Sequence, residues 1–468
     1  MREGTTLFTW KSRFDCSVAE LYSWHARSGA LERLIPPWED TWVLERNGEG
    51  VHPGTRAKLR IHFGPIPLSW YALHLSDEPG RSFCDEQSRG PFAFWRHQHL
   101  FTDSGDGGAI LEDRIEYRMF FHRLMPSVLK KHLQQRLKKT FVSRHATLAA
   151  DLAVHRRCSG QSLRFLVSGA GGLLGRELLP FLTTGGHEVW RLVRRVPRPG
   201  SREIYWDPAQ GEIDVGAIPE IDGIIHLAGE NIAQGWWTTE KRRRIIASRV
   251  KGTALLARVA ASLAVKPKVF VSASAIGCYG NTGNQWVGEE QAYGSDFISE
   301  VCRRWEEAVS PALEAGIRTP LLRIGVVLTA KGGALRQLHL ALRFGIGRLG
   351  NGEQFVSWIS IDDMLSAILH AAVCPQLDGP VNIVAPEPVT NRGLMAAMGD
   401  CLAIRASLTV PPWLLRVRFG QMADEAILAG CRVRADLLQR SGFSFRHPAL
   451  ALALPHLLGS DREQEKKK

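Results

Sequence analysis

The stretch that most constrains the fold is an apolar run ending in a cluster of glycines, residues 163–179 (LRFLVSGAGGLLGRELL). The pattern is typical of a short buried strand, a tight turn and the first turns of a helix. Glycines in such a turn let main-chain N–H groups approach a phosphate and let the helix pack closely on the strand. The stretch therefore predicts a dinucleotide-binding turn, with Gly169, Gly172, Leu173, Leu174 and Gly175 as its binding residues.

The sequence that follows supports this interpretation. An apolar helix continues from the turn, and a second strand, residues 188–193 (EVWRLV), comes at the distance that a strand–helix–strand unit requires. Because 45 glycines among 468 residues produce some matches by chance, the alternative is a structural glycine turn in another kind of α/β sheet.

The residues after the second strand predict which dinucleotide binds. Folds that prefer NAD place Asp or Glu there to bind the ribose 2′-hydroxyl, whereas this chain has Arg194 and Arg195. Guanidinium groups suit the negative charge of a 2′-phosphate. We therefore expect NADP as the cofactor, and the alternative is a solvated basic turn.

Two later strands end in small residues. Residues 221–227 are followed by Ala228 and Gly229, and residues 268–272 are followed by a loop over residues 273–280. Because ligands of α/β sheets bind at the carboxyl ends of parallel strands, we expect the cofactor to contact Leu227, Ala228, Gly229 and Ser272.

The first 155 residues predict a separate domain. A strand over residues 8–14 precedes a helix that starts with a capping box, Ser17 and Glu20. Turn signals separate six further expected strands, and leucines and aromatic residues three or four apart predict a long amphipathic helix over residues 129–152. The six strands are expected at residues 40–46, 55–63, 69–75, 81–87, 95–103 and 108–119.

Composition narrows the function classes. The net charge of +12 is spread along the chain, so we expect no nucleic-acid partner, and the eight cysteines stand singly without metal-ligand spacing. Neither a signal peptide nor a membrane span is recognisable. The composition thus predicts a cytoplasmic protein of two or three domains, with a charged tail at residues 461–468.

Four histidines of the first domain suggest a metal or acid–base site. They are His62, His74, His97 and His99, and the histidines of one strand share a face. Hydrogen-bonded or surface histidines are the favoured explanation, so the sequence predicts no metal.

The element order of residues 1–155 is that of an α+β helix-grip fold, in which a curved sheet wraps a helix over a cavity. With fragments such as residues 90–97 (GPFAFWRH) and 111–117 (LEDRIEY), it resembles the polyketide cyclase and START-like superfamily. The resemblance implies a small apolar ligand and supplies no catalytic motif.

Residues 163–455 resemble the extended short-chain dehydrogenase/reductase superfamily, and within it one epimerase-like subfamily. The resemblance rests on residues 227–233, 272–280, 305–307, 322–328 and 358–364. It implies a Rossmann-like, doubly wound parallel sheet with a C-terminal lobe. The expected domains are residues 1–155, an NADP-binding domain over 162–400, and a C-terminal extension over 401–460.

The chain matches only part of the superfamily's catalytic residues. The superfamily's catalytic Ser or Thr matches Ser274, but the positions of its Tyr-x-x-x-Lys pair hold Phe297 and Val301. Neither side chain transfers a proton. We take Tyr279 as the replacement, and the other candidates are Tyr293, Cys278 and Glu300.

Two functions remain open. The first is an NADP-dependent epimerase or reductase acting on a small or apolar substrate. The second is a non-catalytic nucleotide-sensing or regulatory protein, for example one linked to cell division, with a lipid-like ligand or partner on the N-terminal domain. Arg348 is an anion contact or part of a surface turn, and Asp362 and Asp363 are expected to cap a helix. The oligomeric state is not predicted.

Overall fold

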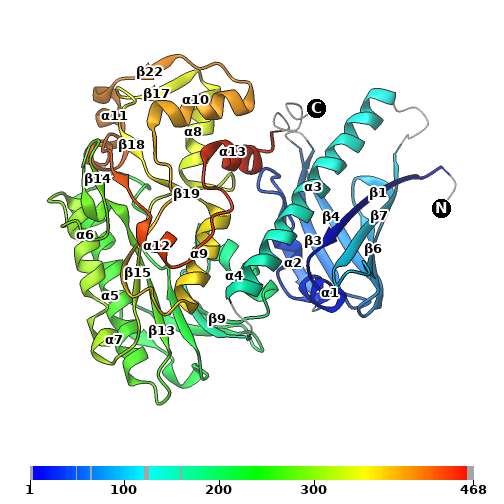
Figure 1. Ribbon diagram of the computed structural model, residues 1–468, viewed down its shortest axis with the longest axis horizontal. Coiled ribbons are helices and arrows are strands. Elements are labelled where there is room, and N and C mark those ends of the chain that lie inside the picture. Colours follow the sequence, from blue (N-terminus) through cyan, green and yellow to red (C-terminus); the bar gives the residue numbers. More distant parts are fainter. Residues whose placement is uncertain (1–3, 49, 64–65, 121–125, 159–160, 461–468) are drawn as a thin grey trace. The chain divides into compact units, whose positions relative to one another are not determined.

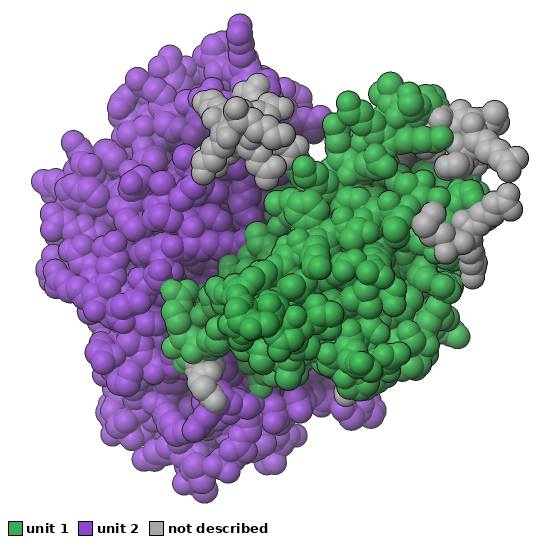
Figure 2. Space-filling model, turned by 45° about the vertical axis from the view of Figure 1, so that its right-hand side comes forward, with its two compact units in different colours: residues 1–160, 180–186 green, residues 161–179, 187–468 purple. Residues whose placement is uncertain are grey.

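The computed structural model describes residues 4–48, 50–63, 66–120, 126–158 and 161–460 (Figure 1). Two compact units are present: residues 1–160 with 180–186, and residues 161–179 with 187–468 (Figure 2). The predicted charged tail, residues 461–468, lies outside the described residues. None of the described helices is long and apolar enough to cross a lipid bilayer.

The first unit begins with a strand and a capped helix, as the sequence predicts. Ser17 accepts a hydrogen bond from the backbone N–H of Glu20 at 3.2 Å and so starts α1 (Val18–Ala26). A short helix, α2 (Ala30–Arg33), follows. The apolar face of α1 is buried through Leu21 and Trp24.

A seven-stranded antiparallel sheet forms the body of this unit, in the order β1-β7-β6-β5-β4-β3-β2. All six strands expected after the first helix are present, with ends shifted by a few residues. The strands are β1 (Thr6–Phe14), β2 (Trp42–Asn47), β3 (Arg56–Phe63), β4 (Ile66–Glu78), β5 (Ser82–Arg89), β6 (Phe92–Asp103) and β7 (Ala109–Met119).

The long helix α3 (Ser127–Cys158) completes the helix-grip fold. Phe141, Leu148 and Leu152 on one face are almost fully buried, and Phe141 packs against Trp95 and Ile115 of the sheet. The helix runs to Cys158, beyond the end at residue 155 that the sequence suggests for this domain, and the polar residues of its last turn belong to the helix.

The second unit is built on an eight-stranded sheet in the order β11-β10-β9-β8-β12-β13-β15-β20. Only the β10–β11 pair is antiparallel. This order is that of the Rossmann-like fold, which confirms the predicted class. The strands are β8 (Arg164–Ser168), β9 (Glu188–Val193), β10 (Glu203–Asp207), β11 (Glu212–Ile213), β12 (Gly223–His226), β13 (Val269–Ala275), β15 (Pro320–Ile324) and β20 (Gly379–Ile383).

Helices cover both faces of this sheet (Figure 1). On one face lie α5 (Thr239–Ser262), α6 (Phe297–Glu307) and α7 (Ser310–Glu314), and on the other α4 (Leu173–Thr184) and α9 (Ile361–Val373). Because both faces are covered, the central strands are mostly apolar. Ile224, Ile225, Phe270 and Val271 are accordingly fully buried.

Short strand pairs and helices form the C-terminal lobe. Its parallel pairs join segments far apart in the chain, for example β17 with β22 and β14 with β23. The elements are β14 (Trp286–Val287), β16 (Val326–Leu328), α8 (Gly333–Arg343), β17 (Ile346–Leu349), β18 (Phe355–Val356), β19 (Trp358–Ser360), β21 (Val389–Thr390), α10 (Asn391–Leu402), β22 (Leu408–Val410), α11 (Pro412–Phe419), β23 (Arg432–Val433), α12 (Asp436–Arg440) and α13 (Leu450–Leu458).

Candidate functional site

The glycine turn joins the carboxyl end of β8 to the start of α4. In the sheet β8 lies between β9 and β12, which is where the strand order reverses. Open α/β sheets bind ligands outside the carboxyl ends of the strands at that point. The fold therefore puts the predicted binding turn where a dinucleotide site is expected.

Two glycines fix the shape of the turn. Gly169 has φ +74°, and a Cβ atom there would lie 2.7 Å from the carbonyl carbon of Leu227 and 2.8 Å from the nitrogen of Ala228. A Cβ atom on Gly175 would lie 2.3 Å from the carbonyl oxygen of Gly169. Neither position accepts a side chain without a backbone shift. The same contacts bring Leu227 and Ala228 beside the turn.

The outer part of the turn is open. Gly171 and Gly172 are exposed, and a Cβ atom on Gly171 would meet no atom within 4 Å. Leu173 and Leu174 form the first turn of α4, a helix of 12 residues. Main-chain N–H groups at the start of such a helix attract anions. The open backbone at Gly171 fits the approach of a pyrophosphate, whereas the N–H of Gly172 is donated to the carbonyl oxygen of Gly169 at 2.9 Å.

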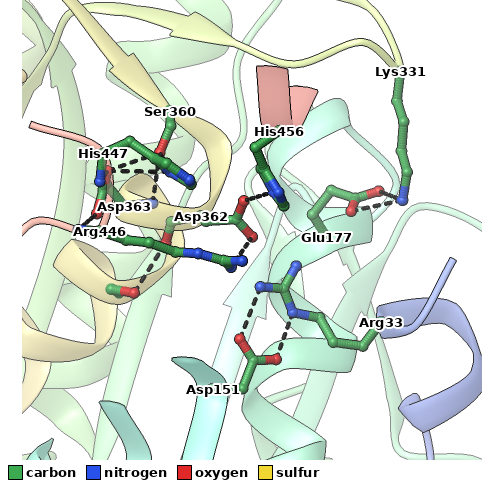
Figure 3. Close-up of polar contacts among 11 residues, drawn as sticks. Arg33, Asp151, Glu177, Lys331, Ser360, Asp362, Asp363, Arg446, His447 and His456 are labelled. Carbon is green, nitrogen blue, oxygen red and sulfur yellow. Dashed lines mark hydrogen bonds and ion pairs between the residues drawn. The ribbon is translucent and has the colours of Figure 1, made fainter. Parts of the chain in front are cut away.

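A second wall comes from a loop that the sequence analysis did not single out. Lys331 Nζ lies 2.9 Å from each carboxylate oxygen of Glu177 on α4 (Figure 3). A Cβ atom on Gly332 would lie 3.2 Å from the side chain of Leu173. The loop before α8 is thus held against the start of α4. No signal in the sequence links residues 154 positions apart.

The two arginines after β9 differ in their surroundings. Arg195 is paired with the buried carboxylate of Glu203 at 2.6 Å, and Arg191 lies 2.8 Å from the same oxygen. Arg194 is exposed and makes no hydrogen bond or ion pair with any described residue. Of the predicted pair, only Arg194 has a guanidinium free for a phosphate.

Strand β13 is longer than predicted. It extends to Ala275, so Ser274 lies inside a strand and not in the expected loop. Ser272 and Ser274 are both almost fully buried, and Ser272 Oγ donates to the carbonyl oxygen of Ala273 at 3.3 Å. Parallel pairing with β15 extends the strand from Ser272 to Ala275, whereas the pairing with β12 ends at Ser272, and the local sequence does not reveal this difference.

Ser274 leads into a buried polar network that the sequence analysis missed. Its hydroxyl donates to Oε1 of Glu306 at 2.6 Å, and Arg323 binds both Glu306 oxygens at 3.0 and 2.9 Å. The ion-paired side chains are 4% and 3% exposed. The usable signal was Arg323 itself, a charged residue within an apolar strand.

The candidate tyrosines join the same network. Tyr279 donates to Asn382 Oδ1 at 2.6 Å and accepts from Arg323 at 3.1 Å, and Tyr293 donates to Glu306 Oε2 at 2.7 Å. Burial raises the pKa of both hydroxyls. A catalytic tyrosine needs a lowered pKa, so this geometry favours a protonated hydroxyl with an internal partner.

Asp362 and Asp363 do not cap the helix as expected, and their carboxylates bind the C-terminal segment instead. Ser360 caps α9, while Asp363 accepts from the backbone N–H groups of Arg446 and His447 at 2.6 and 3.0 Å (Figure 3). His456 of α13 lies 2.8 Å from Asp362. The two carboxylates thus anchor the C-terminal segment.

Arg348 donates to Thr409 Oγ1 at 2.5 Å.

The first unit holds a cavity of about 520 Å³, lined mostly by apolar side chains. The four histidines singled out in the sequence all line it, and His62 bonds the backbone oxygen of Asp40 at 2.8 Å. Burial lowers the pKa of His74, His97 and His99, so their rings are neutral at pH 7. The cavity fits the predicted small apolar ligand.

Comparison with known families agrees with the division into two units. Residues 165–299 match the NAD dependent epimerase/dehydratase family, and residues 15–146 match the family described as polyketide cyclase / dehydrase and lipid transport. Residues 410–457 match a domain family of unknown function.

Sequence identity to individual proteins shows which family the chain belongs to. The epimerase family protein Mb2239 of Mycobacterium bovis is 38% identical over 289 residues, which are 62% of this chain and 95% of that protein. This chain belongs to the epimerase family. The human epimerase family protein SDR39U1 is 32% identical over 300 residues, 63% of this chain and all of that protein. The predicted membership of the epimerase-like subfamily, with its N-terminal cyclase-like domain, is confirmed.

Solved structures of epimerase-family members agree. A nucleoside-diphosphate sugar epimerase from Corynebacterium glutamicum is 31% identical with a TM-score of 0.78, covering 98% of this chain and 92% of that one. The human SDR39U1 structure, solved with NADPH, is 30% identical with a TM-score of 0.58 and covers 64% of this chain and 99% of that one. The first of these neighbours therefore matches nearly the whole of both units.

Proposed function

We propose that this chain binds NADP(H) at the glycine turn and acts on a small substrate, either reducing a carbonyl with a hydride from NADPH or epimerising an alcohol by passing a hydride to NADP⁺ and taking it back. The observation that carries the proposal is the open turn of Gly171 and Gly172 at the reversal point of the sheet. The NADPH-containing structure of its human relative supports it. When bound, NADPH supplies a hydride.

Arg194 is the proposed contact of the 2′-phosphate. Its guanidinium is exposed at the end of β9, whereas Arg195 is engaged by Glu203. Gly169, Gly172, Leu173, Leu174 and Gly175 would hold the pyrophosphate, and Leu227, Ala228, Gly229 and Ser272 would line the nicotinamide side. These assignments extend the sequence-based prediction with the geometry of each side chain.

Ser274 and Tyr279 remain the proposed catalytic residues. In the structure each hydroxyl has an internal acceptor, Glu306 for Ser274 and Asn382 for Tyr279. Each must exchange that acceptor for the substrate in order to hydrogen-bond a reacting oxygen. This requirement, with the replacement of the Tyr-x-x-x-Lys pair by Phe297 and Val301, predicts slow turnover.

Cofactor titration tests the proposal. We expect fluorescence titration of the full chain to give at least tenfold tighter binding of NADPH than of NADH. Arg194→Ala should weaken NADPH binding about 10- to 100-fold, because a hydrogen bond to a charged group contributes about 1.5–3 kcal/mol. NADH binding should not change. The matched control is Arg258→Ala, an exposed arginine on α5.

Two results would count against the proposal: tighter binding of NADH than of NADPH, or equal losses for the Arg194 and Arg258 variants. Catalysis is tested separately, by following the absorbance of NADPH with a panel of carbonyl compounds. Turnover that Ser274→Ala abolishes would support the enzyme. Tight NADPH binding without turnover on any compound would favour a nucleotide-sensing role instead.

A further inference from the structure

The cavity of the first unit contains a cluster of side chains for which neither the fold nor the family accounts. His97 and His99 are two residues apart on β6, so both point to the same face of the sheet. Asp85 of β5 lies opposite His97 in the strand register, and Asp113 of β7 lies opposite His99. Asp85, His97 and His99 all line the cavity.

Asp113 lies beside both imidazole rings. His97 Nε2 and His99 Nδ1 lie 2.9 and 2.7 Å from the same carboxylate oxygen, Asp113 Oδ1, but only the contact of His97 has the geometry of a hydrogen bond. The other oxygen of Asp113 lies 2.6 Å from His145 Nε2. A neutral imidazole that donates from one nitrogen has a lone pair on the other. Donation from His97 Nε2 to Asp113 therefore leaves the lone pair of that ring on Nδ1.

One nitrogen of each ring faces a second carboxylate. His97 Nδ1 and His99 Nε2 lie 3.8 and 3.9 Å from the same oxygen, Asp85 Oδ1. In the described part of the chain no side chain or N–H group donates a hydrogen bond to the Asp85 carboxylate, although its side chain is only 17% exposed. Three electron-pair donors thus converge on one point of the cavity wall, and burial raises the pKa of the Asp85 carboxyl. Such an arrangement is unfavourable unless a proton or a metal cation lies among them.

We propose that Asp85 Oδ1, His97 Nδ1 and His99 Nε2 bind a divalent transition-metal ion, with a further coordination position open to the cavity. The three ligand atoms lie within 4.8 Å of one another. Ligand atoms about 2.1 Å from a tetrahedral Zn²⁺ ion lie about 3.4 Å apart, so the two nitrogen–oxygen separations of 3.8 and 3.9 Å would have to shorten by about half an ångström on metal binding.

The surroundings have the composition of a metal centre. Two imidazoles and one carboxylate with an open position bind Zn²⁺ in catalytic sites and Fe²⁺ in oxygenases. Histidine ligands of such centres donate the N–H of their second nitrogen to a carboxylate, as His97 does to Asp113. The apolar cavity wall would limit the access of water to the open position.

A hydrogen-bonded histidine cluster, the explanation favoured from the sequence, accounts for Asp113 and His145. It gives the Asp85 carboxylate no hydrogen-bond partner among the described residues. A metal ion would bind this carboxylate directly and add to the positive charge of the nearby Arg144 guanidinium. The test therefore concentrates on Asp85 and on the two nitrogens that face it.

The probe is Zn²⁺, added to the full chain after dialysis against a chelator. We expect one equivalent to bind at micromolar or lower concentration. Asp85→Asn, which keeps the size of the side chain and removes its charge, and His99→Gln should each weaken binding at least 100-fold. The control is His132→Gln, an exposed histidine on α3 outside the cavity lining. Circular dichroism checks the fold of every variant.

A Co²⁺ spectrum of the unaltered chain gives a readout that needs no variant. Nitrogen and oxygen ligands should produce visible ligand-field bands without the near-ultraviolet charge-transfer band of thiolate ligands. The proposal is overturned if the chain takes up no Zn²⁺ at micromolar concentration, if the Co²⁺ spectrum reports thiolate ligands, or if the folded cluster variants bind as tightly as the control.

Discussion

Ser274 donates its hydroxyl hydrogen to Oε1 of Glu306 across 2.6 Å, in a part of the second unit where Ser274 is 2% exposed. The contact joins strand β13 to helix α6, two elements whose sequences show no sign of meeting. It makes the residue that best matches the superfamily's catalytic serine a part of the buried framework as well.

Removal of this hydroxyl should therefore lower stability. Ser274→Ala should reduce the free energy of unfolding by about 1.5–3 kcal/mol, the contribution of a hydrogen bond to a charged group. Urea denaturation followed by tryptophan fluorescence measures it. Ser272→Ala is the matched control, because that hydroxyl bonds only a neighbouring carbonyl oxygen at 3.3 Å and should contribute about 1 kcal/mol or less. Equal losses for the two variants would contradict this prediction.

The ion pair beneath Ser274 should matter more. Arg323→Met leaves the Glu306 carboxylate buried without its counter-charge, and such a change costs about 3–5 kcal/mol. Replacing both residues, as Arg323→Met with Glu306→Leu, should recover part of the loss because no buried charge is then left alone. Chemical denaturation of the single and double variants measures the difference. A double variant less stable than Arg323→Met would show that the unpaired charge is not the cause.

Replacing two glycines of the turn by alanine should affect the free energy of unfolding differently. Gly175→Ala places a methyl group 2.3 Å from the Gly169 carbonyl oxygen, so a loss of about 1–3 kcal/mol of unfolding free energy is expected. Gly171→Ala meets no atom within 4 Å and should leave stability unchanged within about 0.5 kcal/mol. If the pyrophosphate approaches this backbone, the same methyl group should weaken NADPH binding at least tenfold. Unchanged binding by Gly171→Ala would move the cofactor away from this part of the turn.

His226 should make stability depend on pH. Burial, with a smaller effect of Arg249, lowers its pKa to about 3, whereas an unfolded histidine has a pKa of about 6.5. Between these values the unfolded chain binds one more proton than the folded chain at this residue. The stabilising contribution is therefore complete above pH 6.5 and falls by about 1.4 kcal/mol for each pH unit below it.

Urea denaturation from pH 5 to pH 7.5 isolates this effect when the unaltered chain is compared with His226→Gln. As pH falls, the variant should lose stability less steeply, because its unfolding takes up about one proton fewer. His132→Gln serves as control, since an exposed histidine should leave the slope unchanged. Identical slopes for all three chains would mean that His226 is protonated in the folded state.

Local patterns predicted most of the fold. The periodicity of apolar residues located every strand of the N-terminal sheet and its long helix, because alternation and helical spacing are properties of consecutive residues. The ends were less accurate. Strand β13 continues to Ala275 because parallel neighbours pair with it, and α3 continues to Cys158. Neither extension is encoded in the residues at the boundary alone.

The candidate sites show the same difference between what local sequence reveals and what the fold brings together. For the cofactor site, the glycines, the arginines and the strand ends carried their own signal, since phosphate binding depends on backbone freedom and charge within a few residues. The partners of Ser274, Tyr279 and Tyr293 carried none. Glu306, Arg323 and Asn382 come from three other elements, and only the sheet order brings them together.

The histidine cluster makes the division plain. By itself the sequence determined that His97 and His99 share one face of a strand, because side chains alternate along β-structure. Only the tertiary structure decided that Asp113 lies beside one nitrogen of each ring while Asp85 faces the other nitrogen. That outcome depends on the register of three strands, which is set by hydrogen bonding and packing across the sheet and not by the order of residues along any one of them.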